Sequence, residues 1–347
     1  MADQRSANRQ GSNRQGSNRH SANRQGSNRH SANRQGSNRQ GGNRHTAERH
    51  SGNGQGVGSE GAAALWEAAA RDVRAGADKI ALRNRRNAAL LALVPGVLVG
   101  VLLVALIGSL ASLAAGLVTG IVACVATSIL VWYASAPVLL RWLGAVPASE
   151  DELPRLYNLV DGICTTMGLA MPEIRLLDVD WPDALVLGGP HRRVALVVTR
   201  GLVDGLSLVQ LEGVLAHELV HVNRAEAARG TVAAAVALPV AALGPSKAAS
   251  LVHVLAGRGR EMSCDQSAVR VTRYPPGLRD ALEAIAARAG AGRAGAGLGS
   301  RTGRVASGVL GATSWLWTVA IDPPDDPDSL TGELDAPGIR IAALSEL

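Results

Sequence analysis

The longest apolar stretch of the chain covers residues 87–140, which include no charged side chain. A membrane-spanning helix needs about 20 apolar residues, so these 54 positions suffice for two spans rather than for two buried core helices. Gly108 and Ser109 interrupt the run, and we expect the chain to reverse there. The pattern predicts a transmembrane hairpin over 87–142, with helices at about 88–108 and 112–140. Three aromatic residues near its exit suit a membrane–water interface: Trp132, Tyr133 and Trp142.

Residues 1–60 show the opposite pattern, because they contain almost no apolar side chain. From Ser6 the sequence repeats every five residues, as SANRQ, GSNRQ, GSNRH and so on. Such a segment cannot bury enough apolar surface to offset the entropy lost on ordering, so we predict a disordered tail. An amphipathic stretch and the basic residues Arg83, Arg85 and Arg86 follow, which makes residues 61–86 a juxtamembrane segment.

Residues 147–347 have the mixed pattern of a globular domain. Apolar positions three and four apart predict an amphipathic helix over 153–167. Residues 174–177 and 194–199 predict strands, the second rich in β-branched side chains. Ser207 and Gln210 are spaced as a capping box that opens another helix. The pattern therefore favours an α+β fold that is mainly helical with a small β-sheet.

The positive charge of the chain belongs to its tail. Ten arginines and two acidic residues give residues 1–55 a net charge of +8, and since the whole chain carries +6, the remainder carries −2. Nucleic-acid binding by the folded part is therefore not expected. The tail is either a low-complexity tether, which we favour, or a polycation that contacts anionic lipid headgroups or RNA.

The cysteines and the flanking arginines indicate the compartment. Cys124, Cys164 and Cys264 are odd in number and far apart, which predicts free thiols in a reducing environment. Arginines precede the hairpin at 83–86 and follow it at 141, whereas its loop is uncharged. By the positive-inside rule, we expect a multi-pass protein of the cell (plasma or inner) membrane with its tail and globular domain in the cytoplasm.

The stretch His217-Glu218-Leu219-Val220-His221 carries the clearest chemical signal. On a helix, residues four apart share a face, so both imidazoles can bind one metal ion while Glu218 lies beside its open position. A catalytic zinc site usually takes three protein ligands and a water. Downstream, the candidates for the third ligand are His253 and Glu261, and Asp265 shares a helix face with Glu261.

This HExxH stretch, the later Glu261-x-x-x-Asp265 pattern and the N-terminal hairpin together resemble peptidase family M48, and within it the HtpX-like membrane zinc metallopeptidases. The similarity extends over about 153–287, for example at Gly168-Leu169-Ala170-Met171-Pro172 and Thr199-Arg200-Gly201-Leu202. It implies a zincin-type metalloprotease domain that holds one Zn²⁺ ion.

The resemblance also implies roles for individual residues. His217, His221 and Glu261 would be the zinc ligands, Glu218 the general base, and Asp265 the residue that orients a ligand imidazole. The strand 194–198 would be the sheet edge along which a peptide substrate adds, through Val194, Ala195, Leu196 and Val197.

Two segments depart from the family pattern. Asp183-Ala184-Leu185 stands where the family has Asn-Ala-aromatic, and Leu334-Asp335-Ala336-Pro337 stands where it often has Thr-His-Pro, so the histidine is missing. The family also commonly inserts two membrane helices between the second histidine and the glutamate. Here that region offers only 23 apolar residues, at 230–243 and 248–256, and two spans need about 40. All three ligands must meet at one ion, so we predict that 230–256 rests on or dips into the membrane without crossing it.

The sequence thus predicts a membrane-bound zinc endopeptidase that hydrolyses peptide bonds of unfolded or membrane proteins. Its partners would be peptide substrates and the lipid bilayer. The main alternative is a membrane-anchored scaffold or binding protein that keeps the zinc fold without turnover, and a third is prenyl-protein processing.

Overall fold

The computed structural model describes residues 59–189, 194–257, 260–295, 309, 312–319 and 336–347. The predicted disordered tail, with its proposed lipid contact, lies outside these residues. So do Leu334 and Asp335 of the segment that lacks the family histidine.

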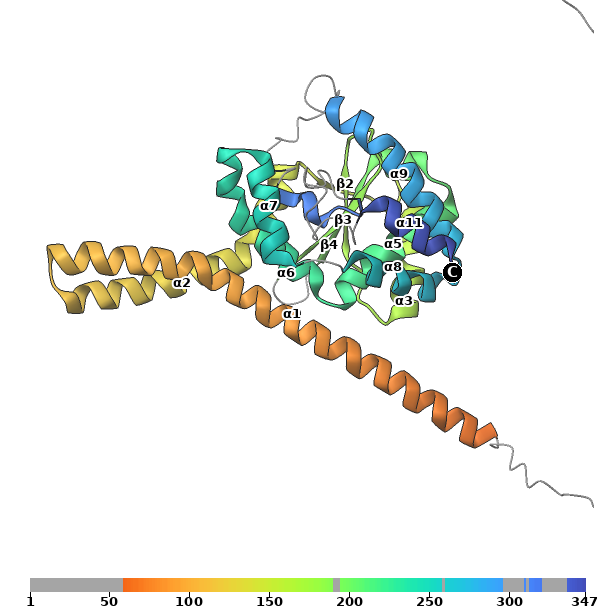
Figure 1. Ribbon diagram of the computed structural model, residues 1–347, viewed down its shortest axis with the longest axis horizontal. Coiled ribbons are helices and arrows are strands. Elements are labelled where there is room, and N and C mark those ends of the chain that lie inside the picture. Colours follow the sequence, from red (N-terminus) through yellow and green to blue (C-terminus); the bar gives the residue numbers. More distant parts are fainter. Residues whose placement is uncertain (1–58, 190–193, 258–259, 296–308, 310–311, 320–335) are drawn as a thin grey trace, which may run out of the picture. The chain divides into compact units, whose positions relative to one another are not determined.

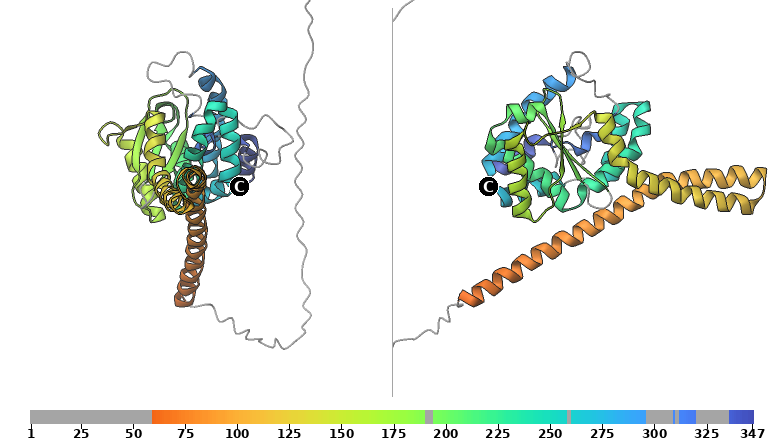
Figure 2. Two further views of the ribbon diagram at one scale, coloured as in Figure 1. Left: turned by 90° about the vertical axis from the view of Figure 1, so that its left-hand side faces the viewer. Right: turned by 180° about the vertical axis from the view of Figure 1, so that it is seen from behind.

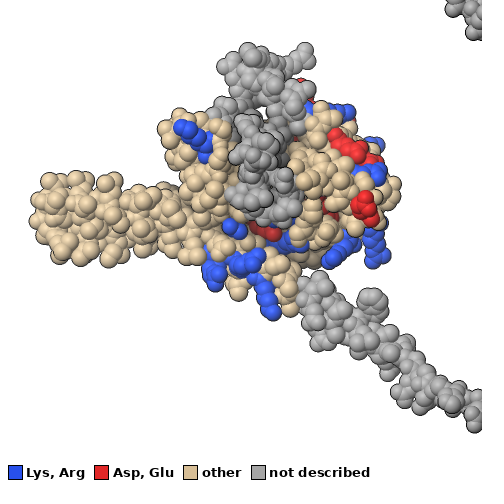
Figure 3. Space-filling model, viewed as in Figure 1, with Lys and Arg blue, Asp and Glu red and all other residues tan. Residues whose placement is uncertain are grey.

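Two long helices come first. α1 (Ser59–Leu110) joins the predicted juxtamembrane segment and the first predicted span into one helix, and α2 is Leu113–Leu143. Figure 1 shows α2 folded back along α1. Many of their apolar side chains are exposed, such as Leu98 at 68% and Leu102 at 66%, and the far part of the pair shows no charged side chain in Figure 3. Both helices are long and apolar enough to cross a membrane, as predicted.

The reversal between them lies at 111–112 instead of 108–109. Ser112 caps α2, since its side chain accepts a hydrogen bond from the Ala115 N–H at 3.2 Å. Gly108 lies inside α1, and its backbone is in close contact with Gly116 of α2. A Cβ atom on Gly116 would lie only 2.8 Å from the Gly108 nitrogen. Gly116 therefore permits tight packing of the two helices at Gly108, which is not a turn residue.

The sheet has four strands in the order β1-β2-β4-β3: β1 (Val146–Pro147), β2 (Glu173–Leu177), β3 (Ala184–Gly188) and β4 (Val194–Thr199). The two predicted strands are present as β2 and β4. However, β4 pairs with β2 in parallel and with β3 antiparallel, so it is an interior strand. The prediction that Val194–Val197 forms the substrate edge is wrong. The outer strands of the sheet are β1 and β3, and the short apolar run of β3 was not predicted as a strand.

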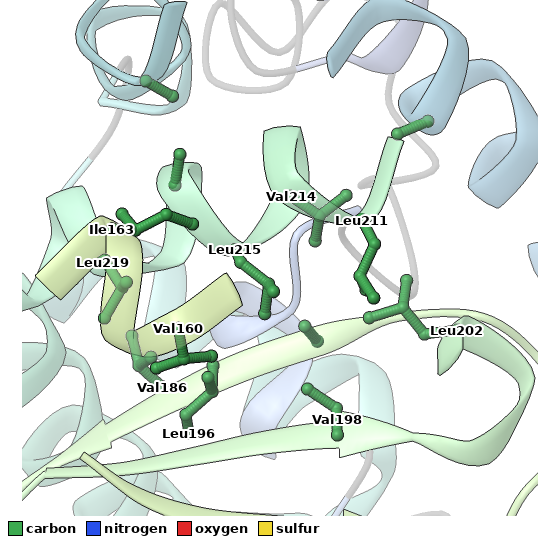
Figure 4. Close-up of a cluster of buried hydrophobic side chains, with 14 of the residues drawn as sticks. Val160, Ile163, Val186, Leu196, Val198, Leu202, Leu211, Val214, Leu215 and Leu219 are labelled. Atoms are coloured by element: carbon green, nitrogen blue, oxygen red, sulfur yellow. The ribbon is translucent and has the colours of Figure 1, made fainter. Parts of the chain in front are cut away.

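Helices cover both faces of the sheet (Figures 1 and 2). One face packs against α3 (Pro154–Met167), α5 (Leu208–Asn223), α8 (Glu261–Thr272) and α9 (Pro275–Gly295). Figure 4 shows this core, where Leu215 and Leu219 of α5 point toward Val186 and Leu196 of the sheet. The other face packs against the end of α2, α6 (Glu226–Ala237), α7 (Pro245–Ala256) and the segment around Trp315. α4 (Arg200–Gly205) follows β4, and α11 (Pro337–Ser345) packs on α8 and α9.

The apolar insertion forms α6, the 3₁₀ helix η2 (Leu238–Leu243) and α7. Residues Glu226–Leu243 are long and apolar enough to cross a membrane, but 44% of this window is buried inside the protein, against 17% and 11% for the two N-terminal helices. α6 also packs closely on β3, since a Cβ atom on Gly188 would lie 2.4 Å from the Ala228 nitrogen. It is therefore a packed helix of the domain on at least one face.

Candidate metal centre

The HExxH stretch lies in the second half of α5. The predicted capping box is confirmed: the Ser207 side chain accepts from the Gln210 N–H, and the Gln210 side chain accepts from the Ser207 N–H. With its start fixed, α5 places His217 and His221 one turn apart, with ring centroids 4.7 Å from each other. Their Nε2 atoms are 3.1 Å apart. Both imidazoles therefore present a nitrogen to the same point.

Glu261 completes a group of three ligand atoms. It is the first residue of α8, and its Oε2 lies 3.0 Å from His217 Nε2 and 3.4 Å from His221 Nε2. The three side chains are buried and could hold a metal ion, since their ligand atoms lie within 4.8 Å of one another. Two imidazoles and one carboxylate are a common ligand set of catalytic zinc. The residues present therefore fit the metal that the sequence predicted. His253 lies in α7 and is not among them.

The electrostatics of this group favour an anionic carboxylate beside the two imidazoles. Burial alone would raise the pKa of Glu261, but Arg260 and both histidines lower it well below its usual range. Burial would lower the pKa of His217, but Asp265 and Glu261 raise it. Opposite charges thus hold the carboxylate and the two imidazoles together. A divalent cation can bind at the same place when it displaces the protons of the imidazoles.

A carboxylate lies behind each histidine. Asp265 Oδ1 is 2.8 Å from His217 Nδ1, as expected for the predicted orienting residue. Glu226 Oε2 is 2.8 Å from His221 Nδ1, and sequence reasoning missed it. The sequence feature that could have indicated this role is the position of Glu226, five residues after His221 and in the first turn of α6. Burial would raise the pKa of Glu226, but its hydrogen bond with His221 and the neighbouring Arg260 and Arg224 lower it to about 2.

His221, Glu226 and Cys264 form a second buried group of possible ligands. The Cys264 Sγ lies 3.5 Å from both His221 Nδ1 and Glu226 Oε2. However, two guanidinium groups approach the same carboxylate, with Arg260 Nη1 at 3.6 Å and Arg224 Nη1 at 4.0 Å. These cations already neutralise Glu226, so this group is better suited to fix His221 than to bind a second metal ion.

Arg340 is a further residue that the sequence did not reveal. It reaches from α11 into the domain, is 1% exposed, and binds Asp265 through Nε at 2.7 Å and Nη2 at 2.8 Å. Its Nη1 lies 3.9 Å from Glu261 Oε2. Burial would raise the pKa of Asp265, but Arg340 and His217 lower it. Arg340 therefore balances the charge of the carboxylate behind His217.

Glu218, which follows His217 on α5, is 1% exposed. Its Oε1 accepts a hydrogen bond from Thr318 Oγ1 at 2.7 Å. Burial raises the pKa of Glu218, which His217 and His221 partly offset. Trp317 forms an antiparallel bridge with Leu185, and the Thr318 N–H donates to the Ala184 carbonyl at 3.0 Å. One end of the outer side of β3 is therefore covered by the chain's own segment around Trp317.

A large cavity in the described part of the chain lies elsewhere. It has a volume of about 1060 Å³ and lies between the end of α2 and the sheet, where Leu140, Arg141 and Arg175 are among its lining residues. None of the lining residues belongs to the candidate metal centre.

Comparison with known proteins agrees with this arrangement. Residues 153–286 match the model of peptidase family M48. A protease HtpX homolog of Dictyoglomus turgidum is 31% identical over 192 residues, which are 46% of this chain and 63% of that protein. One of Dictyoglomus thermophilum is 32% identical over 183 residues, 44% of this chain and 60% of that protein. One of Trichormus variabilis is 29% identical over 196 residues, 47% and 68% of the two chains.

The chain thus spans less than two thirds of the length of the two Dictyoglomus relatives. No solved structure matches it.

Proposed function

Because the chain belongs to peptidase family M48, we propose that it is a membrane-bound zinc endopeptidase that hydrolyses peptide bonds of unfolded or membrane proteins. The observation that carries the proposal is the convergence of His217, His221 and Glu261 on one point, with Glu218 on the same helix as the two histidines.

In this proposal, each residue of the centre has one role. His217, His221 and Glu261 hold Zn²⁺, while Asp265 and Glu226 hold the imidazoles of His217 and His221 in the ligating orientation. When bound, the metal polarises the scissile carbonyl and lowers the pKa of the attacking water. Glu218 accepts the proton of that water at a carboxylate oxygen and passes it to the leaving amine.

The substrate would bind to β3 in place of β4. β3 is the outer strand on this side of the sheet, and its Ala184 end lies beside Glu218, because Thr318 contacts both residues. An extended peptide can add to such an edge by backbone hydrogen bonds. A substrate must be locally unfolded to present its backbone in this way, which supports unfolded segments as the substrate class.

We further propose that α1 and α2 cross the cell membrane and that the metal centre faces the cytoplasm. The support is the distribution of charge, with Arg83, Arg85 and Arg86 before the apolar part of α1, Arg141 near the end of α2, and no charge at the turn. The segment 230–256 would rest on the membrane surface.

Metal removal tests the proposal. The full chain, purified in detergent, is expected to bind one Zn²⁺ and to cleave an unfolded protein such as casein. Treatment with a chelator is expected to abolish cleavage, and added Zn²⁺ to restore it, because the ligands act only when the metal is bound. The measurements are zinc per chain by mass spectrometry and product formation by electrophoresis.

Two outcomes would contradict the proposal. Cleavage that persists in the zinc-free chain would exclude metal-dependent chemistry. A chain that binds zinc and does not cleave any unfolded protein or peptide would favour the scaffold alternative.

Glu226→Gln is expected to weaken zinc binding about 10- to 100-fold, the usual effect of losing a residue that orients a ligand. The amide keeps the size of Glu226 but removes the charge that holds His221 Nδ1. Competition with a chromophoric zinc chelator measures the dissociation constant. Glu152→Gln, which changes an exposed glutamate that pairs with Arg200, is the matched control. Equal zinc affinity of wild type and Glu226→Gln would show that His221 does not depend on Glu226.

A further inference from the structure

The carboxylate of Glu218 is held by a residue one hundred positions later in the chain. Thr318 Oγ1 lies 2.7 Å from Glu218 Oε1, and both residues are 1% exposed. A hydrogen bond to an ionised group in such a buried place is stronger than one between neutral groups. This contact therefore fixes the side chain of Glu218.

The backbone of Thr318 is itself fixed on two sides. Its N–H donates to the Ala184 carbonyl at 3.0 Å, and its carbonyl accepts from Arg340 Nη1 at 2.5 Å. The preceding Trp317 bridges Leu185 and packs its ring edge-on against Trp181, with centroids 4.8 Å apart. The hydroxyl is thus presented by a rigid part of the protein.

The single hydroxyl proton of Thr318 has two acceptors within reach, Glu218 Oε1 at 2.7 Å and the Ala184 carbonyl at 3.2 Å. The carboxylate is closer and carries the charge, and Ala184 already accepts the Thr318 N–H. The proton therefore goes to Glu218 Oε1. Glu218 Oε2 is buried and has no hydrogen-bond partner within the described residues. One oxygen is held and the other is left for chemistry.

We propose that Thr318 is a positioning residue for Glu218. It holds Oε1 so that Oε2 stays oriented to receive a proton. The inference rests on the proposed function, in which Glu218 is the general base. It concerns the rate of the chemical step and not the binding of substrate or zinc.

Thr318→Val tests the inference because it removes the hydroxyl and keeps the branched shape. Turnover of an internally quenched peptide by the full chain in detergent is expected to show kcat lowered about tenfold, with KM and zinc per chain unchanged. Thr318→Ser retains the hydroxyl and is expected to stay within about twofold of wild type. Thr166→Val removes an exposed hydroxyl of α3, which donates to the Gly162 carbonyl, and is expected to leave kcat unchanged.

A positioning role can be separated from a structural one by a double-mutant cycle. If Thr318 acts through Glu218, Thr318→Val should cause no further loss in a Glu218→Gln background, whereas a structural defect would lower the residual rate again. Thr318→Ala gives the same comparison if the valine variant fails to fold, as judged by its melting temperature.

The outcomes distinguish this inference from the function on which it rests. A wild-type chain without zinc-dependent cleavage would overturn both. If the wild type is active, an equal kcat of the Thr318→Val variant would overturn only the positioning role. The same conclusion would follow from a Thr318→Ser variant as impaired as Thr318→Val, from a changed KM, or from additive losses of rate in the double-mutant cycle.

Discussion

Replacing Glu218 by glutamine is expected to lower kcat for peptide hydrolysis by about 10²- to 10⁴-fold while the chain still binds one zinc ion. Glutamine has the same shape, and its amide oxygen can still accept the hydrogen bond from Thr318. It cannot take a proton from water at neutral pH. The variant therefore removes the general base without disturbing the three metal ligands. The measurement is kcat on a quenched peptide at matched zinc content.

Glu212→Gln is the matched control for this experiment. Glu212 lies on the same helix, five residues before His217, and is partly exposed. Its replacement is expected to leave kcat unchanged. Equal activity of wild type and Glu218→Gln would refute the protease proposal and leave the zinc-fold scaffold as the better account. If the prediction holds, the inactive variant can trap membrane substrates for identification by proteomics.

Arg340→Met is expected to destabilise the domain by about 3 to 5 kcal/mol, because it removes the guanidinium that pairs with the buried Asp265 and lies beside Glu261. Both partners of the broken ion pair are nearly fully buried, so water cannot replace the lost contacts. For a domain of this size the melting temperature is expected to fall by roughly 6 to 20 °C. Intrinsic tryptophan fluorescence during heating in detergent measures it.

Two other substitutions serve as comparisons for this prediction. Arg279→Met removes an arginine paired with its neighbour Asp280 on the outer side of α9, and is expected to change the melting temperature little. Arg340→Lys keeps the charge but not the two-point contact with Asp265, and should give an intermediate value. A melting temperature of Arg340→Met equal to that of wild type would mean that Asp265 needs no counter-charge.

The sequence allowed prediction of those parts of the centre that depend on local spacing. His217 and His221 share a face because they are one helical turn apart, and the capping box of α5 joins Ser207 to Gln210. Glu261 and Asp265 follow the same rule on α8. These features need only the period of a helix, so they can be read before the fold is known.

The missed features depend on contacts between distant parts of the chain. Arg340 meets Asp265 across 75 positions, and Thr318 meets Glu218 across 100. β3 is a strand because β4 pairs with it, although its five apolar residues alone fit a buried helix segment equally well. The edge role of 194–198 was implied by the family resemblance, and with β3 unrecognised nothing in the sequence contradicted it. No local sequence pattern indicates which strand of a sheet lies outermost.

If β3 binds substrates as proposed, its outer side has a consequence for how they are chosen. Ala184 O is engaged by Thr318, and the Gly188 N–H donates to Thr231 Oγ1 at the other end. Alternate residues of a strand turn their backbone groups to the outer side, and the bridge between Leu185 and Trp317 means that the Val186 N–H faces the chain's own segment rather than open space. A peptide that pairs there would gain few hydrogen bonds, each contributing roughly 0.5–1.5 kcal/mol, which is too little for tight recognition.

The choice of substrate would then depend more on how often enzyme and substrate meet than on the amino-acid sequence of the substrate. An enzyme and a damaged protein confined to one bilayer meet at a high effective concentration without any additional contact. Selection by such an enzyme would depend on location and loss of structure, so that the anchor acts as a determinant of specificity.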